Sequence, residues 1–269
     1  MSVGRHTLFN LVGLTAPMVA AVAAIPYLIN ALGPARFGLL TLIWAVVSYF
    51  GLFDLGLGRA LTQRLATAMA LPERNDWQIA QITGTACTLM ALLGLAAGVI
   101  MAVAAPWATS WIREVPDQVE ATRAMIVMAL AVPAVVLTTG LRGIMEAHNA
   151  FAMVNLLRLP FGLLTFLAPV AVAAFWTPRL DVMAGALAAG RWLALAAHAW
   201  GARRITPPAQ RRPCFDSSQV RPLLVAGGWL TLINMLGPVI GYADRFIIAT
   251  TMSASAVSLY VTPQEIVTK

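Results

Sequence analysis

The sequence predicts an all-α membrane protein, a polytopic bundle of about seven transmembrane helices with a truncated eighth. Of the 269 residues, 59% are hydrophobic and 11% are charged, whereas a soluble domain carries about 25% charged residues. The mean hydropathy is +0.78. Apolar stretches close to the roughly 20 residues that a spanning helix needs recur along the chain. Together these observations exclude a disordered chain, a disulfide scaffold and most soluble enzymes.

Seven stretches reach or approach the spanning length, and we expect one helix in each: Thr7–Leu32, Phe37–Ala60, Ile79–Trp107, Ala121–Leu141, Leu159–Trp176, Val182–Trp200 and Leu223–Thr250. The first apolar run exceeds the 7–15 residues of a signal-peptide core, which predicts an uncleaved helix. The fifth stretch is the shortest and could begin upstream near Phe151. An eighth starts near Ala254 and is cut at Lys269, so we expect a fragment or a truncated gene product.

The arginines predict that the N-terminus lies in the cytoplasm. With that orientation most loop arginines face the cytoplasm, and those outside are Arg36, Arg113, Arg123 and Arg179. Such an asymmetry is the positive-inside pattern of inner-membrane proteins. Because the basic residues lie in short loops and form no continuous stripe, we expect no nucleic-acid partner.

A basic loop at 201–222 predicts a domain boundary. It contains Pro207, Pro208 and Pro213, and it would separate a six-helix lobe (1–222) from the first helix and truncated second helix of another lobe (223–269). Shifting the chain by 221 positions aligns pairs along the first two helices: Leu11 with Leu232, Val12 with Ile233, Pro17 with Pro238, Ala35 with Ala256 and Thr41 with Thr262. This weak repeat is typical of two-lobed secondary transporters.

Enzyme chemistry has no recognisable residue pattern here. The three histidines form no HExxH motif, GxSxG and P-loop sequences are absent, and the acidic residues do not cluster. Cys87 and Cys214 lack the spacing of metal ligands. We therefore expect neither an enzyme, nor a metal site, nor a cofactor.

Three segments resemble the Wzx-type oligosaccharide flippases of the multidrug/oligosaccharidyl-lipid/polysaccharide exporter superfamily. The first runs from Ala31 to Arg59 and holds the most specific part, FDLGLGRA at 53–60, with Gly56, Gly58 and Arg59 at a bend. The others begin at Gly140 (GLRGIMEAHN) and Tyr242 (YADRFII). The resemblance covers the whole chain, but the family has roughly twelve or more helices in two lobes.

The resemblance implies a function and a location. Such proteins move an undecaprenyl-pyrophosphate-linked oligosaccharide from the cytoplasmic to the periplasmic leaflet of the bacterial inner membrane by alternating access. It implies contacts with the lipid-linked oligosaccharide, membrane lipids and polysaccharide polymerase or export proteins. The alternatives are a multidrug or toxic-compound exporter of the same superfamily and a non-transporting membrane subunit.

Four basic residues are candidates for binding the pyrophosphate. Arg191 is central in its span, where an unpaired arginine costs about 2.5–3.5 kcal/mol, and His198 shares its helical face. We interpret both as a cationic cavity wall; alternatively Arg191 pairs with an acid such as Asp54 or Asp244, or lies near an interface. Arg142 and Arg158 flank a short cytoplasmic turn, where they could admit substrate or serve as positive-inside anchors.

Three further charges lie within predicted spans. Asp54, in the second helix, is either a static partner beside the bend or a group that changes protonation in an ion-coupled cycle. Asp244 and Arg245 are adjacent in the seventh helix and point to different faces, so we expect no pairing between them. Either could pair across the two lobes or line the cavity.

Overall fold

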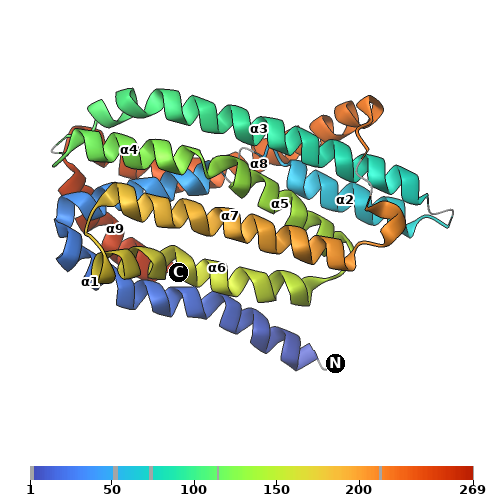
Figure 1. The fold of residues 1–269 in the computed structure, drawn as a ribbon, viewed down its shortest axis with the longest axis horizontal. Coiled ribbons are helices and arrows are strands. Elements are labelled where there is room, and N and C mark those ends of the chain that lie inside the picture. The colour runs from blue at the N-terminus through green and yellow to red at the C-terminus, as the bar shows by residue number, and fades with distance from the viewer. Residues whose placement is uncertain (1–2, 51–53, 73–74, 114, 212–213, 269) are drawn as a thin grey trace.

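A computed structural model describes residues 3–50, 54–72, 75–113, 115–211 and 214–268, and the side chains of 17–45, 54–72, 75–113, 115–211, 214–228 and 243–263 among them. Regular structure in these ranges is helical throughout, which confirms the all-α fold class. The helices lie along one long axis (Figure 1). They are α1 (Val3–Phe50), α2 (Leu57–Ala70), α3 (Asp76–Ser110), α4 (Gln118–Ala129), α5 (Val132–Ala147), α6 (Phe151–Phe175), α7 (Leu180–Ile205), the 3-10 turn η1 (Pro208–Gln210), α8 (Ser217–Thr251) and α9 (Ala254–Thr268).

Helix α1 is a hairpin of two helices. Its backbone leaves the helical region at Gly33, where φ is 76° and ψ is 161°, a conformation that residues with a Cβ rarely adopt. Pro34 follows and cannot donate a helical hydrogen bond. The chain reverses there (Figure 1), so the first predicted span, Thr7–Leu32, ends where the first half of α1 ends.

Two predicted spans are each broken into two helices. The single helix predicted over Phe37–Ala60 is wrong, because α1 ends at Phe50 and α2 begins at Leu57 after a turn at 54–56. The fourth span breaks at Leu130 and Ala131 between α4 and α5. Pro133 explains this second break, since proline removes the hydrogen bond to the carbonyl four residues earlier. At the break itself, the Trp192 indole of α7 donates to the carbonyl of Leu130 (3.2 Å).

The chain is a multi-pass membrane protein. Five helices in the described residues are long and apolar enough to cross a bilayer: Pro17–Ala45, Asp76–Ser110, Gln118–Ala147, Phe151–Phe175 and Leu180–Ile205. Large apolar side chains face outward, among them Val103 (76% exposed), Phe175 (90%) and Leu193 (61%), as expected for a surface in lipid. Helix α6 begins at Phe151, the upstream alternative for the fifth span.

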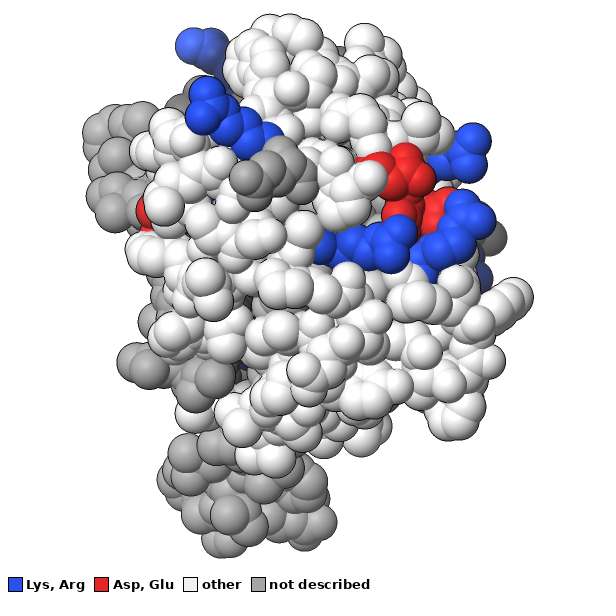
Figure 2. Space-filling model, turned by 90° about the vertical axis from the view of Figure 1, so that its left-hand side faces the viewer, with Lys and Arg blue, Asp and Glu red and all other residues white. Residues whose placement is uncertain are grey.

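The two ends of the bundle carry different charges. The Gly33 end holds Gly33 and the described loop residues at 111–113, 115–117, 176–179 and 252–253, and it includes the four arginines expected outside. Figure 2 views this end, where basic and acidic side chains lie side by side. The linker end holds the described loop residues at 71–72, 75, 148–150, 206–211 and 214–216, and the start of α1 lies toward that end too (Figure 1). The loop arginines therefore divide between opposite ends as the positive-inside pattern requires.

Helix α5 packs against α2, α3 and α7. Helices α8 and α9 pack against the earlier helices: α8 contacts α2 and α3, and α9 contacts α1. The shift of 221 residues carries Gly33, where α1 reverses, to Ala254, where α9 begins after α8. The two hairpins thus turn at equivalent positions.

Candidate functional site

The bend in the FDLGLGRA segment is a turn built on Asp54. Leu55 and Gly56 both have positive φ (50° and 65°). The Asp54 carboxylate accepts hydrogen bonds from the backbone N–H of Gly56 (2.9 Å) and Gly58 (3.2 Å) and from the Thr139 hydroxyl (3.1 Å). Asp54 therefore lies before α2 and not on a helix, because its carboxylate satisfies the N–H groups that begin the helix.

Gly143 of α5 lets α2 approach α5 closely at Gly58. A Cβ atom placed on Gly143 of α5 would lie 2.8 Å from the Gly58 carbonyl oxygen and 2.6 Å from the Thr62 hydroxyl. The next residue, Arg59, is exposed, and Phe53 lies outside the described residues. The described part of the FDLGLGRA segment, which carries the most specific family resemblance, therefore forms the start of α2 and its crossing with α5.

The Asp54 turn yields a first testable prediction. Asp54→Ala should lower the free energy of unfolding by about 2 kcal/mol, since loss of a helix cap costs roughly 0.5–2 kcal/mol and Thr139 also loses its acceptor. Thr139→Val removes only the cross-helix bond and should cost less than Asp54→Ala. Thermal unfolding in detergent compares them, and equal costs would contradict a capping role for Asp54.

Arg142 lies in the second half of α5. Its Nε is 3.5 Å from the Glu146 carboxylate one turn later, and both side chains are half-exposed. Arg158, on α6, is exposed.

Arg191 occupies a small pocket between α6 and α7, open on one side. The cavity volume is about 10 Å³, roughly the room of one water molecule, and the pocket is lined by Phe161, Leu164, Thr165, Leu187, Gly190 and Arg191. The Arg191 guanidinium donates a 3.4 Å hydrogen bond to the Thr165 hydroxyl. Neither Asp54 nor Asp244 forms the ion pair that was the alternative, and the ion pairs recorded among the described residues do not involve Arg191.

His198 lies on the same face of α7 as Arg191 and is buried. Its Nδ1 donates to the Ala194 carbonyl of its own helix (2.7 Å). The ring centroid lies 6.3 Å from that of Phe161, which also lines the Arg191 pocket. The predicted shared face of these two residues is therefore present at the α6–α7 contact.

Asp244 and Arg245 lie on α8, away from this pocket. The Asp244 carboxylate accepts from the Tyr260 hydroxyl of α9 (2.5 Å) and from the backbone N–H of Arg245 (2.7 Å). The Arg245 side chain is buried. Asp244 therefore holds the α8–α9 hairpin together, and the structure does not bring it to Arg191.

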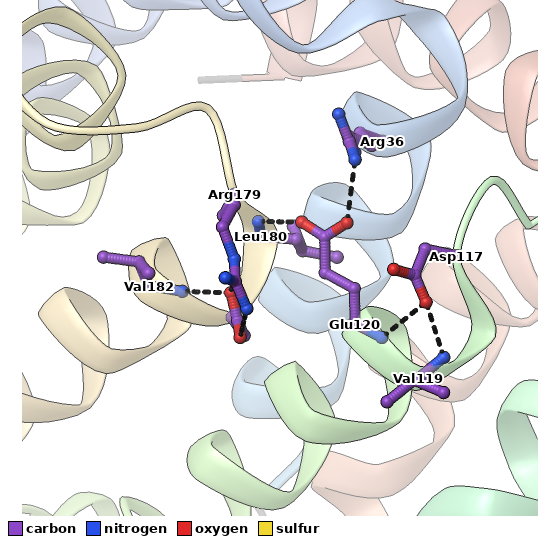
Figure 3. A network of polar contacts seen from close by, with 8 residues as sticks. Arg36, Asp117, Val119, Glu120, Arg179, Leu180 and Val182 are labelled. Atoms are coloured by element: carbon purple, nitrogen blue, oxygen red, sulfur yellow. Dashed lines mark hydrogen bonds and ion pairs between the residues drawn. The ribbon is translucent and has the colours of Figure 1, made fainter.

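Sequence reasoning missed Glu120, a buried carboxylate at the Gly33 end. It accepts a hydrogen bond from the Leu180 backbone N–H (2.5 Å) and pairs with Arg36 (3.0 Å) (Figure 3). Glu120 thus fixes the starts of α4 and α7 to the segment after the α1 turn. Glu120 directly precedes the predicted span Ala121–Leu141, so from the sequence it resembles an exposed loop residue. Its burial results from tertiary packing alone.

Sequence reasoning also missed the contacts of the basic loop. The Gln210 side chain is buried; its amide donates to Asp76 (2.7 Å) and its oxygen lies 3.2 Å from His148 Nε2. Further along, the Asp216 carboxylate accepts from the Ser218 N–H (2.9 Å) at the start of α8. This hydrogen bond holds the pKa of Asp216 below its usual value.

In the part of the chain that the structure describes, no group of three or more His, Cys, Asp or Glu could hold a metal ion. The arrangement offers instead a guanidinium and a hydroxyl in a low-dielectric pocket. Such a pair of donors suits a phosphate or another anion.

Comparison with known families identifies the chain. A family model described as "Polysaccharide biosynthesis protein" matches residues 3–268. The chain belongs to this family. The match covers α1 to α7 as well as the α8–α9 hairpin.

One curated relative of this chain is a Shigella flexneri protein named "Putative O-antigen transporter". The two are 24% identical over 270 residues, an alignment that covers all of this chain and 63% of the relative. The chain thus spans under two thirds of that relative's length. No solved structure gives a significant match.

Proposed function

We propose that this polysaccharide biosynthesis protein moves a lipid-linked oligosaccharide across the bacterial inner membrane as a flippase. The substrate is an undecaprenyl-pyrophosphate-linked oligosaccharide, carried from the cytoplasmic to the periplasmic leaflet. The observation that carries the proposal is Arg191, a guanidinium in mid-span that faces a hydroxyl instead of a carboxylate. The family match and the printed name of the relative support the saccharide class.

The charge of Arg191 suits the pyrophosphate. An arginine at the centre of a span costs about 2.5–3.5 kcal/mol, and such residues usually face a cavity or a partner. A pyrophosphate offers the oxygens that guanidinium groups bind in bidentate fashion, with Thr165 as a second donor and His198 on the same face. Arg142 and Arg158, nearer the linker end, would meet the head group first.

The two parts of the chain would move against each other. We assign 1–222 to a first lobe and 223–269 to the start of a second. At the Gly33 end the Arg113 backbone bonds to Ala249 (3.2 Å) and to Ala254 (3.3 Å); at the linker end Arg64 donates to Gln219 (3.0 Å). Separate contacts at each end allow each to open in turn, as alternating access requires.

The other charged candidates take structural roles in this proposal. Asp54 caps α2, and Asp244 joins α8 to α9, so neither needs to carry the coupling ion. The surroundings of the flippase would be membrane lipids and the polymerase or export proteins of the same polysaccharide.

Substitution of Arg191 tests the proposed function. Binding of a fluorescent undecaprenyl-pyrophosphate oligosaccharide should weaken at least about tenfold in Arg191→Ala, because a charge-assisted contact is worth roughly 1.5–3 kcal/mol. Arg191→Lys should retain part of the affinity, and Arg123→Ala, at the exposed Gly33 end, should match wild type. Equal affinity of wild type and Arg191→Ala would exclude this site, and preference for an apolar cation would favour the toxic-compound exporter.

A further inference from the structure

Helix α7 presents one exposed face along most of its length. Its exposed residues are Ala189, Trp192, Leu193, Ala196, Trp200, Arg203 and Arg204. They recur every three or four positions, so they form a single stripe on the helix. Arg191 and His198 lie on the opposite side of α7, toward α6. The stripe is therefore separate from the proposed substrate site.

The stripe changes from apolar to basic in the last turn of α7, which lies at the linker end of the bundle (Figure 1). From Val182 to Trp200 the helix is about 28 Å long at a rise of 1.5 Å per residue, close to the roughly 30 Å of a hydrocarbon core. Tryptophan is enriched at the membrane interface, which agrees with Trp200 as the last apolar residue of the stripe. Arg203 and Arg204 follow about 5–6 Å further along the helix axis, at the level of the lipid head groups.

Trp200 orients Arg204. The guanidinium carbon of Arg204 lies over the indole, 4.7 Å from the ring centroid. A cation–π contact does not use the N–H groups that point away from the ring, so these can donate to phosphate oxygens. Neither Arg203 nor Arg204 forms an ion pair with a carboxylate of the described residues. We call Trp200, Arg203 and Arg204 the α7 patch.

The position and chemistry of the α7 patch define the kind of partner that fits it. The partner must carry negative charge, because the patch holds two guanidinium groups, and it must lie at the depth of the head groups. It must also cover the apolar part of the stripe, where Trp192 and Leu193 are exposed. A soluble anion has no apolar part, whereas an acidic phospholipid has both a phosphate and acyl chains.

We infer that the α7 patch binds the head group of an acidic phospholipid, such as phosphatidylglycerol, whose acyl chains lie along the stripe. A basic residue near an anionic membrane surface raises affinity about fivefold, so two residues give a preference of roughly 25-fold over a zwitterionic lipid. This inference goes beyond the proposed function and does not rest on it, because no oligosaccharide is involved.

Native mass spectrometry with phosphatidylglycerol and phosphatidylcholine of the same acyl chains tests the inference. The wild-type chain should bind its first phosphatidylglycerol molecule roughly 25-fold more tightly than phosphatidylcholine, and Arg203→Gln/Arg204→Gln should lose most of that preference. Arg204→Gln alone should lower the affinity for phosphatidylglycerol about fivefold. Arg123→Gln is the matched control, since it removes an exposed arginine from the Gly33 end, and it should leave this affinity unchanged.

Substitution of Trp200 separates a built site from charge alone. Trp200→Leu keeps both arginines and an apolar side chain but removes the ring under Arg204. It should lower the affinity for phosphatidylglycerol about two- to fivefold, the range expected for an exposed cation–π contact. Trp200→Phe keeps an aromatic ring and should lose less.

Thermal unfolding in nanodiscs distinguishes lipid binding from a structural role of the two arginines. A ligand stabilises the folded state to which it binds, so adding phosphatidylglycerol to phosphatidylcholine discs should raise Tm more in wild type than in Arg203→Gln/Arg204→Gln. If the arginines only interact with the dipole at the end of α7, the double variant would lose the same stability in both lipids, which would contradict the inference.

Three further results would overturn the inference. Equal affinity of wild type for the two lipids would do so without any substitution. Equal losses in Arg204→Gln and Arg123→Gln would mean a diffuse attraction between charges instead of a site. Displacement of phosphatidylglycerol by inorganic phosphate would mean that the patch recognises phosphate and not a lipid. None of these measurements uses an oligosaccharide, so failure here is distinct from failure of the Arg191 binding test.

Discussion

Glu120→Ala should lower the free energy of unfolding by about 3 kcal/mol, because breaking one side of a buried ion pair costs roughly 3–5 kcal/mol. Arg36 is 35% exposed at its side chain and Glu120 only 7%, so water screens Arg36 in part and places the cost at the lower limit. The Leu180 N–H also loses its acceptor, and an unsatisfied buried donor is destabilising. Three segments would lose their common anchor (Figure 3).

Two companion variants separate charge from hydrogen bonding. Glu120→Gln keeps an oxygen for Leu180 but removes the charge, and should cost about half as much. Asp181→Ala removes a carboxylate from the same end, where Arg179 pairs with it in a more exposed setting (2.7 Å), and should cost under about 1 kcal/mol. Chemical unfolding in mixed micelles ranks the three, and a Glu120→Ala cost no greater than that of Asp181→Ala would show that Glu120 is not an anchor.

The length of the apolar runs predicted where the membrane-spanning segments lie, but not where their helices are interrupted. Apolar runs placed α3, α6 and α7 well, since a spanning helix must satisfy its backbone internally over the whole apolar run. The same runs concealed the breaks at Asp54 and Leu130, which depend on local hydrogen bonding. Pro133 was a visible signal for the second break. For the first, two glycines hinted at a bend, but the capping by Asp54 needs the fold.

For the candidate site too, the sequence predicted features within one helix but missed contacts between segments. Helical spacing correctly placed Arg191 and His198 on one face, because the α-helix repeats nearly every seven residues. Arg191 contacts Thr165 and His198 contacts Phe161. Because both of these residues lie on α6, the residue spacing within the α7 segment could not predict them. Glu120 and Gln210 were missed because each lies at a helix end or in a loop. There, burial is decided by segments 60 or more residues distant.

An added methyl group at the crossing of α2 and α5 should destabilise the protein. Gly143→Ala places a Cβ 2.8 Å from the Gly58 carbonyl oxygen and 2.6 Å from the Thr62 hydroxyl. The hydroxyl can rotate away, but the backbone carbonyl cannot, so the two helices must separate. Overpacking of this kind costs roughly 1–3 kcal/mol, and we expect about 3 kcal/mol here because backbone blocks the site.

Gly185→Ala provides the matched control on α7. It makes the same substitution inside a helix, but no atom lies within 4 Å of the added Cβ. Alanine favours helix over glycine by about 0.5–1 kcal/mol, so Gly185→Ala should be neutral or stabilising while Gly143→Ala destabilises. If thermal unfolding shows that Gly143→Ala lowers stability while Gly185→Ala does not, the loss of stability comes from the contact between α2 and α5. If both variants shift stability alike, helix propensity alone explains them and the close α2–α5 contact is not formed.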